Sequence, residues 1–160
     1  MIYMNKHLQY AVKQASSHDY EPCMDHRVCA IIVRGGSILS VGYNQRKTNA
    51  FVEHYTDKVR GGGRAYCLST HAEQDAILAI RKKIDLNGCT IYVARLRSPE
   101  SKYGKVGLSR PCHICQQVLL SYGIKKAYYT ITDNEYGVMK ISENTVNTIF
   151  CESEIYFSEK

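Results

Sequence analysis

Two short motifs contain the side chains best suited to chemistry, His71-x-Glu73 and Pro111-Cys112-x-x-Cys115. A catalytic zinc ion takes about three protein ligands, commonly imidazole or thiolate, and keeps one position open for water. His71, Cys112 and Cys115 make a complete set of this kind, with no ligand left over. The two motifs together therefore predict a catalytic zinc site with one open position.

Each motif lies at the start of a predicted helix, where unpaired N–H groups and the helix dipole create a partial positive charge. This charge stabilises thiolates at Cys112 and Cys115 and favours metal binding near neutral pH. A bound zinc ion lowers the pKa of a water ligand to about 7. Glu73 stands two residues after His71 at the same helix start, so we predict that it carries protons.

Simpler interpretations exist for each motif. An isolated Cys112-x-x-Cys115 is also typical of a redox pair or of half a structural zinc site, but the sequence has no second close pair. A redox motif would not explain His71-x-Glu73 on another helix. Thr70-x-x-Glu73 matches a capping box, which begins a helix without any catalysis. The presence of both motifs favours catalysis, with which capping by Thr70 is compatible.

Other polar residues near the motifs have weaker interpretations. We expect His113 to orient a neighbour or lie at the surface rather than act as a fourth ligand, because a closed site could not hold water. Basic side chains in two loops are candidates for binding phosphate, although a solvated loop is the commoner outcome. These basic residues are Arg60, Arg64, Lys102, Lys105 and Arg110.

Apolar periodicity predicts the elements that position the motifs. In chain order we expect a helix over 6–17, strands over 28–33 and 37–43, a helix from 71 to about 87, a strand over 89–95, a helix over 111–122 and a strand over 125–132. The last strand, helix and strand favour a parallel crossover. Tyr128 and Tyr129 should face opposite sides of the sheet. One sheet covered by helices on both faces is therefore predicted.

Length and composition predict a single domain over residues 1–160, since 160 residues with 44% hydrophobic content can form one core. No apolar run approaches the roughly 20 residues of a membrane helix, and no signal peptide is recognisable, so we expect a cytoplasmic protein without membrane contact. Seven cysteines, two of them in one close pair, favour metal binding in a reducing compartment. A net charge of +6 favours anionic partners and leaves both nucleotides and nucleic acid open.

The two motifs resemble the signature of the cytidine and deoxycytidylate deaminase superfamily of zinc-dependent nucleobase deaminases, His-x-Glu followed by Pro-Cys-x-x-Cys. The resemblance covers residues 5 to 132. The hairpin over 27–44 is similar to the family's first two strands, and Gly-Ile-Lys-Lys-Ala-Tyr-Tyr over 123–129 is similar to its fourth. The resemblance implies a three-layer α/β/α sandwich around a central mixed sheet of about five strands.

The resemblance also implies substrate contacts. Asn44 would contact the sugar and backbone groups around Ala72 the base, while Pro111 and the preceding Arg110 complete the predicted substrate-binding residues. Some deoxycytidylate deaminases hold a second, structural zinc ion, and here Cys23, Cys67 and nearby histidines such as His26 are the candidates. Small sites of this family often lie between subunits, so we expect a homo-oligomer.

Deoxycytidylate deaminases are most similar in spacing, with a long loop before His-Ala-Glu and Gly-Ile-Lys-Lys after the cysteine motif. Three features depart from the common pattern: Cys29 in place of a glycine, the length of the loop over 44–71 and a basic insertion over 97–109. The predicted function is hydrolytic deamination of a cytosine-type base on a free nucleotide or nucleoside such as dCMP. Two alternatives stay open: a deaminase that edits cytosine or adenine in single-stranded DNA, RNA or tRNA, and a non-catalytic zinc-binding module.

Overall fold

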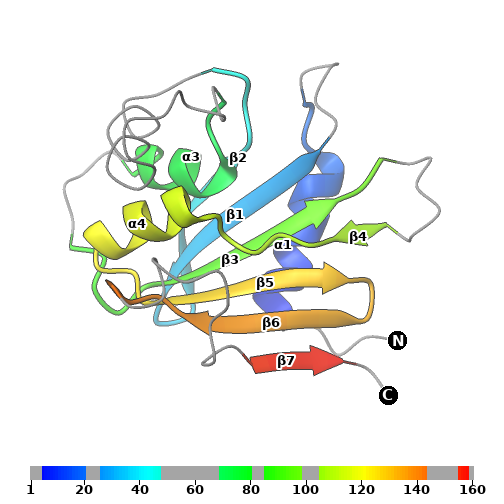
Figure 1. Ribbon diagram of the computed structural model, residues 1–160. Helices are drawn as coiled ribbons and strands as arrows, with labels where there is room; N and C mark the ends of the chain where they lie inside the picture. The colour runs from blue at the N-terminus through cyan, green and yellow to red at the C-terminus, as the bar shows by residue number, and fades with distance from the viewer. Residues whose placement is uncertain are drawn as a thin grey trace.

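A computed structural model describes residues 5–20, 26–47, 69–80, 85–98, 105–143 and 155–158. Within these ranges the chain forms three helices and seven strands (Figure 1). The helices are α1 (Lys6–Ser17), α3 (Ala72–Leu78) and α4 (His113–Ser121). The strands are β1 (Arg27–Arg34), β2 (Ser37–Tyr43), β3 (Thr90–Leu96), β4 (Val106–Gly107), β5 (Lys126–Thr132), β6 (Glu135–Lys140) and β7 (Ile155–Ser158).

The strands form one mixed sheet in the order β2-β1-β3-β5-β6-β7, with β4 paired to the end of β3. β3 and β5 are parallel and are joined through α4, whereas the other paired strands are antiparallel. The predicted strand-helix-strand crossover is therefore confirmed. The sheet also contains β4 and β6, which we did not predict, and β7, which lies in the tail whose sequence pattern was ambiguous.

Helices cover both faces of this sheet, with α1 behind the strands and α3 and α4 in front of them (Figure 1). Alternate residues of β1 divide between two apolar clusters: Ile31 packs with the α1 side, and Ile32 packs with the side of α3 and α4. Tyr128 and Tyr129 divide in the same way, as their alternation predicts. The three-layer α/β/α arrangement is thus confirmed.

The helix ends differ in part from the predicted ones. α3 stops at Leu78 instead of near residue 87, because the Ile80 N–H bonds the Ile77 carbonyl three residues back and tightens the last turn. α4 begins at His113 with Cys112 as its N-cap, so the proline before Cys112 precedes the helix. The predicted glycine stop is present at Gly123, with a φ of 88°.

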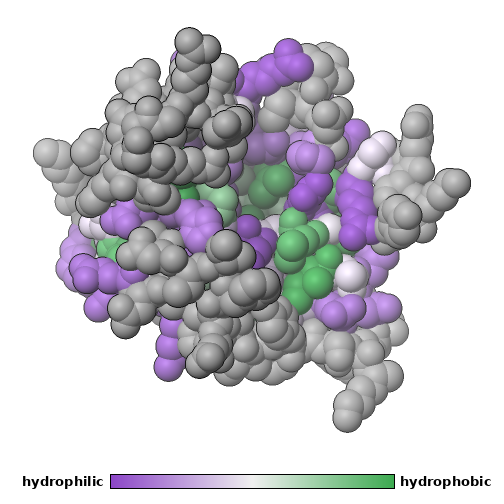
Figure 2. All heavy atoms as spheres, viewed as in Figure 1, coloured by the Kyte–Doolittle hydropathy of each residue, from purple (hydrophilic) through white to green (hydrophobic). Residues whose placement is uncertain are grey.

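The surface on the side shown in Figure 1 is mixed in character (Figure 2). Hydrophilic side chains predominate among the coloured residues, and a smaller hydrophobic group lies near the centre of the view. Among the described residues, none of the helices has the length and hydropathy that a membrane crossing requires.

The start of α3 is held against β2 by a close backbone contact at Gly42. A Cβ atom at this position would lie 2.2 Å from the Ala76 nitrogen and 2.4 Å from the Ala72 carbonyl oxygen. Only glycine leaves room for the helix backbone so near the strand. Two hydrogen bonds to the Asp75 carboxylate strengthen the contact, from the Tyr43 N–H at 2.9 Å and from the Gln45 side-chain amide at 2.9 Å.

Gly42→Ala is expected to lower the free energy of unfolding by about 1–3 kcal/mol, since the added methyl group must push α3 away from the sheet. The midpoint of thermal unfolding, measured by circular dichroism, checks this. Gly107→Ala is the matched control, because the nearest atoms to its new Cβ, at 3.2 Å, belong to the flexible Arg97 side chain. Equal shifts for the two variants would contradict the close-packing argument.

Candidate active site and metal centre

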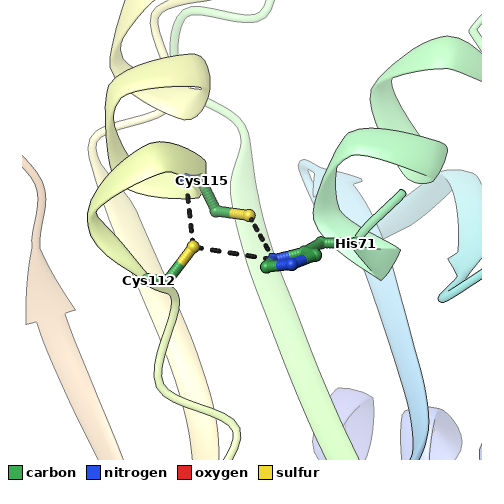
Figure 3. A group of neighbouring side chains, drawn as sticks. All are labelled: His71, Cys112 and Cys115. Carbon is green, nitrogen blue, oxygen red and sulfur yellow. Dashed lines mark hydrogen bonds between the residues drawn. The ribbon is translucent and has the colours of Figure 1, made fainter. Parts of the chain in front are cut away.

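His71, Cys112 and Cys115 converge at the facing ends of α3 and α4 (Figure 3). The His71 Nδ1 atom lies 3.5 Å from the Cys112 Sγ and 3.3 Å from the Cys115 Sγ. All three donor atoms lie within 4.8 Å of one another. A tetrahedral zinc ion with ordinary bond lengths separates a nitrogen and a sulfur ligand by about 3.6 Å, so the spacing and the donor types both fit zinc.

Cys112 caps the start of α4 and Cys115 lies in its first turn, and this geometry favours a thiolate at Cys112. The Cys115 N–H donates to the Cys112 Sγ at 3.5 Å, a bond typical of a helix N-cap. A hydrogen bond from the Cys115 thiol, together with the neighbouring His71, holds the pKa of Cys112 well below its usual range. Cys112 is therefore prepared for metal binding without a large cost of deprotonation.

Glu73 is buried, with 6% of its surface exposed, and it lines the cavity beside the three donors. Burial raises the pKa of its carboxyl group, and the charge of His71 opposes this shift. The capping interpretation of Glu73 is wrong: His71 is the N-cap, and the Thr70 hydroxyl instead donates to the Lys47 carbonyl. The Thr70-x-x-Glu73 capping box is therefore not formed, and Gln74 takes the corresponding position after His71.

Gln74 is a site residue that the sequence analysis missed. Its side-chain oxygen accepts from the His71 N–H at 3.3 Å, and its amide donates to the Cys115 Sγ at 3.7 Å. The side chain is 1% exposed, so it links the two halves of the site from within the core. The signal was present, because glutamine three residues after an N-cap is the usual partner in a capping box.

Gln74→Met is expected to weaken zinc binding by about 10–100-fold, since hydrogen-bond partners of metal ligands commonly contribute that much affinity. Methionine retains the length and packing of the side chain but offers no N–H group to Cys115. Competition with a chromophoric chelator measures the affinity. Gln9→Met on the exposed side of α1 is the control, and equal affinities for the two variants would exclude this role for Gln74.

A cavity of about 430 Å³ adjoins the donor cluster. It is lined by His26, Val28, Asn44, Arg46, Ser69, His71, Ala72, Glu73, Arg95, Leu108, Ser109, Arg110 and Cys112. Three of the predicted substrate-binding residues, Asn44, Ala72 and Arg110, are thus brought to one space with the predicted catalytic residue. Pro111 is buried outside this lining, and its carbonyl accepts a 2.8 Å hydrogen bond from the Gln116 amide.

Asn44 connects the end of β2 to the start of β1. Its side-chain oxygen accepts from the Val28 N–H at 2.8 Å, and its amide nitrogen donates to the His26 carbonyl at 2.9 Å. The amide nitrogen carries two N–H groups, and these contacts use one of them. Asn44 therefore shapes the cavity wall and retains a donor for a ligand.

Buried hydroxyl groups hold the segment that leads from β4 to the cysteine motif. The Ser109 hydroxyl lies 2.6 Å from the Val93 carbonyl and 2.8 Å from the Thr130 hydroxyl, which in turn donates to the Gly107 carbonyl at 2.8 Å. Both side chains are buried, so these bonds are protected from water. They hold Gly107 and Ser109 against β3 and β5, shortly before the predicted ligand Cys112.

Several predicted positions fall outside the residues that the structure describes. These are Cys23, Cys67, Arg60, Arg64 and Lys102, so the predicted second zinc site and the glycine-rich phosphate loop lie there. Two others are described but do not join the donor cluster: His113 is half-buried, and Lys105 is exposed. His26 lines the cavity, where its ring contacts Arg95.

Comparison with known proteins points to the same family as the two motifs. Residues 2–131 match the family described as the cytidine and deoxycytidylate deaminase zinc-binding region. No match was found among curated proteins. Cytidine deaminase from Burkholderia pseudomallei has a similar fold, with a TM-score of 0.53 and 23% identity over 86% of this chain and 94% of that one. The dCMP deaminase of cyanophage S-TIM5 has a TM-score of 0.48 and 20% identity over 81% of this chain and 87% of that one.

The family match extends over most of the sequence and includes both motifs that supply the donor cluster. The Burkholderia structure independently supports the fold. The resemblance inferred from the motifs is therefore confirmed, and the chain belongs to the family of cytidine and deoxycytidylate deaminases with this zinc-binding region.

Proposed function

We propose that this protein is a zinc-dependent hydrolytic deaminase that converts a cytosine-type base to its uracil-type product, acting on a free nucleotide or nucleoside such as dCMP. One observation carries the proposal: His71, Cys112 and Cys115 bring three zinc-type donors together at a cavity that is also lined by the buried Glu73. A redox pair or a closed structural metal site would not require a buried acid next to an accessible space.

His71, Cys112 and Cys115 would hold the zinc ion. When bound, zinc supplies a Lewis acid that lowers the pKa of a coordinated water molecule and so makes a nucleophile available at neutral pH. Gln74 would orient two of these ligands through its hydrogen bonds to His71 and Cys115. The first turn of α4 adds positive potential at Cys112, which favours the thiolate form.

Glu73 would carry the protons of the reaction. Hydrolysis transfers the oxygen of water to the ring carbon that bears the amine, and the two protons of that water go to the ring nitrogen and to the departing amine, which leaves as ammonia. One carboxyl group can make both transfers in turn. Burial raises the pKa of Glu73 towards the working pH, which suits a group that must both take up and release a proton.

The rest of the cavity would hold the substrate. The second N–H of Asn44 can donate to a sugar hydroxyl, the backbone around Ala72 can bond the edge of the base, and Arg110 adds a positive charge to the lining. The preference for deoxycytidylate rests on the similarity of the loop spacing and of Gly-Ile-Lys-Lys to deoxycytidylate deaminases. Pro111 would act indirectly, by directing the chain into the cysteine motif.

We also propose that residues 1–160 form one domain and that the protein works as a homo-oligomer in the cytoplasm. Exposed apolar side chains support self-association, namely Ile38 and Leu39 on the edge strand β2 and Leu78 on α3. A reducing compartment suits the closely spaced thiols of Cys112 and Cys115.

Ammonia release by the zinc-loaded protein tests the proposed function. The panel is cytidine, deoxycytidine, CMP, dCMP, adenosine, guanine and a cytosine-bearing single strand of DNA. Turnover of free nucleosides or nucleotides supports the proposal. Turnover of the strand alone, with a steep loss of rate as salt rises, would assign the protein to the editing deaminases. No turnover of any substrate would favour a non-catalytic zinc-binding module.

A further inference from the structure

The cavity beside the donor cluster is rich in cationic side chains. Besides His71 and Glu73, its lining includes Arg46, Arg95, Arg110 and His26. Glu73 is the single acid among the described residues that line it. The neutral base and sugar of a nucleoside do not require such an excess of positive charge for binding, whereas an anionic substituent does.

Arg95 is the cation whose surroundings are most informative. Its Nη1 donates to the Leu108 carbonyl at 3.4 Å, and its Nη2 lies 2.8 Å from the His26 Nδ1. Neither of these partners is an anion. Its Nε is buried and has no hydrogen-bond partner among the described residues. A partly buried guanidinium whose partners among the described residues are all neutral lacks a counter-charge, which an anionic ligand in the cavity would supply.

The lowered pKa of Arg95 is consistent with this view. Burial is the main cause, and the charge of nearby Arg97 adds to it. Both disfavour the cation in the absence of a ligand. A bound anion would offset both effects, because its negative charge stabilises the cationic form of Arg95.

The fold holds Arg95 on strand β3 and His26 immediately before strand β1. Arg95 lies at the end of β3 opposite Val28 of β1, and its N–H donates to the Thr130 hydroxyl at 3.2 Å. His26 immediately precedes β1, and its carbonyl accepts from the Asn44 amide. A guanidinium and an imidazole are thus fixed at one side of the cavity before any ligand arrives, which lowers the ordering cost of binding.

We propose that Arg95, with His26 beside it, binds the phosphate group of the substrate and makes the enzyme select a nucleotide over a nucleoside. This inference rests on the proposed deaminase function and specifies its substrate class. A planar guanidinium can present parallel N–H donors to two phosphate oxygens, and Arg95 is among the residues that line the cavity. The ligand is a phosphate monoester on a free nucleotide, because one cavity of about 430 Å³ contains both the donor cluster and Arg95.

Binding of the reaction products tests the inference without turnover. Calorimetry would compare dUMP with deoxyuridine on the zinc-loaded wild type, Arg95→Met and Arg95→Lys. We expect Arg95→Met to weaken dUMP binding by roughly 10–100-fold and to leave deoxyuridine unchanged, since only dUMP has the phosphate. Arg95→Lys should recover part of the affinity, because it restores the charge without the planar fork.

Arg97→Met is the matched control, since it removes the same charge two residues away, at a side chain that does not line the cavity. It should leave the affinity for both products within about twofold of the wild type. In steady state, Arg95→Met should raise the KM for dCMP by a similar factor, with a smaller change in kcat and no change for deoxycytidine. Thermal unfolding of each variant would confirm that it is folded.

The outcomes separate this inference from the proposed function. If the wild type deaminates dCMP but Arg95→Met weakens dUMP and deoxyuridine equally or not at all, the phosphate site is wrong and the deaminase stands. If dUMP binding depends on Arg95 but no substrate is turned over, the phosphate site stands and the deaminase is wrong. If only a cytosine-bearing strand depends on Arg95, the ligand is a phosphodiester and the monoester assignment is overturned.

Discussion

Glu73→Gln is expected to lower the rate of deamination by about 10²–10⁴-fold or more, with no loss of bound zinc. Glutamine retains the size and the burial of the side chain, but its amide cannot take a proton from water and pass it on. His71, Cys112 and Cys115 are untouched by the change. Ammonia release and zinc content, measured on the same preparation, check both halves of the expectation.

Burial makes this variant easy to interpret. A buried acid is costly to ionise, so replacing Glu73 with a neutral side chain of equal shape should not reduce the midpoint of thermal unfolding. Glu135→Gln on β6 is the matched control, because it makes the same exchange at a side chain that does not line the cavity. Full activity in Glu73→Gln would show that this carboxyl group is structural and would remove the proton carrier from the mechanism.

Cys112→Ala is expected to remove both zinc and activity. The Cys112 Sγ contacts the His71 Nδ1 at 3.5 Å and caps α4 through the Cys115 N–H, so its loss leaves two donors and an uncapped helix. Zinc bound by cysteine and histidine side chains gains about 10–16 kcal/mol in favourable sites, so loss of one of three donors should weaken affinity by at least roughly a thousandfold. Metal analysis after dialysis and ammonia release measure the two effects.

The control for this variant is Cys29→Ala, which removes a thiol buried in the core against α1, away from the donor cluster. It should keep its zinc and its activity, although it loses some stability through the cavity it creates. Chelation of the wild type should abolish activity, and added zinc should restore it. Retention of zinc by Cys112→Ala would show that the metal is held elsewhere and would contradict the ligand set.

The chemistry of the site could be predicted because it lies in short motifs. His71-x-Glu73 and Pro111-Cys112-x-x-Cys115 each place their functional groups within one helical turn, so local spacing alone shows which side chains can share a metal and an acid. The structure brings the three predicted donors within 4.8 Å of one another. The local sequence does not determine that distance, because it depends on how α3 and α4 pack on the sheet.

Other features could not be predicted from the apolar pattern. Gly137 interrupts the apolar pattern of β6 and argues against a strand, but a Cβ there would lie 2.3 Å from the Tyr129 ring, which occupies the space. The apolar spacing beyond Leu78 predicts a longer helix than α3, whereas the chain turns at Ile80. In both cases a tertiary contact or a tightened turn overrides the local preference.

The sequence by itself determined the fold class, the family, the predicted metal ligands and the predicted proton carrier. Periodicity and motif spacing are local properties, so they can be recognised from the order of the residues alone. Tertiary structure alone decided which further side chains lie beside these groups. Gln74 reaches Cys115 across 41 positions, and Arg95 meets His26 across 69. These contacts depend on strand register and helix packing, which are set by the whole core rather than by any segment.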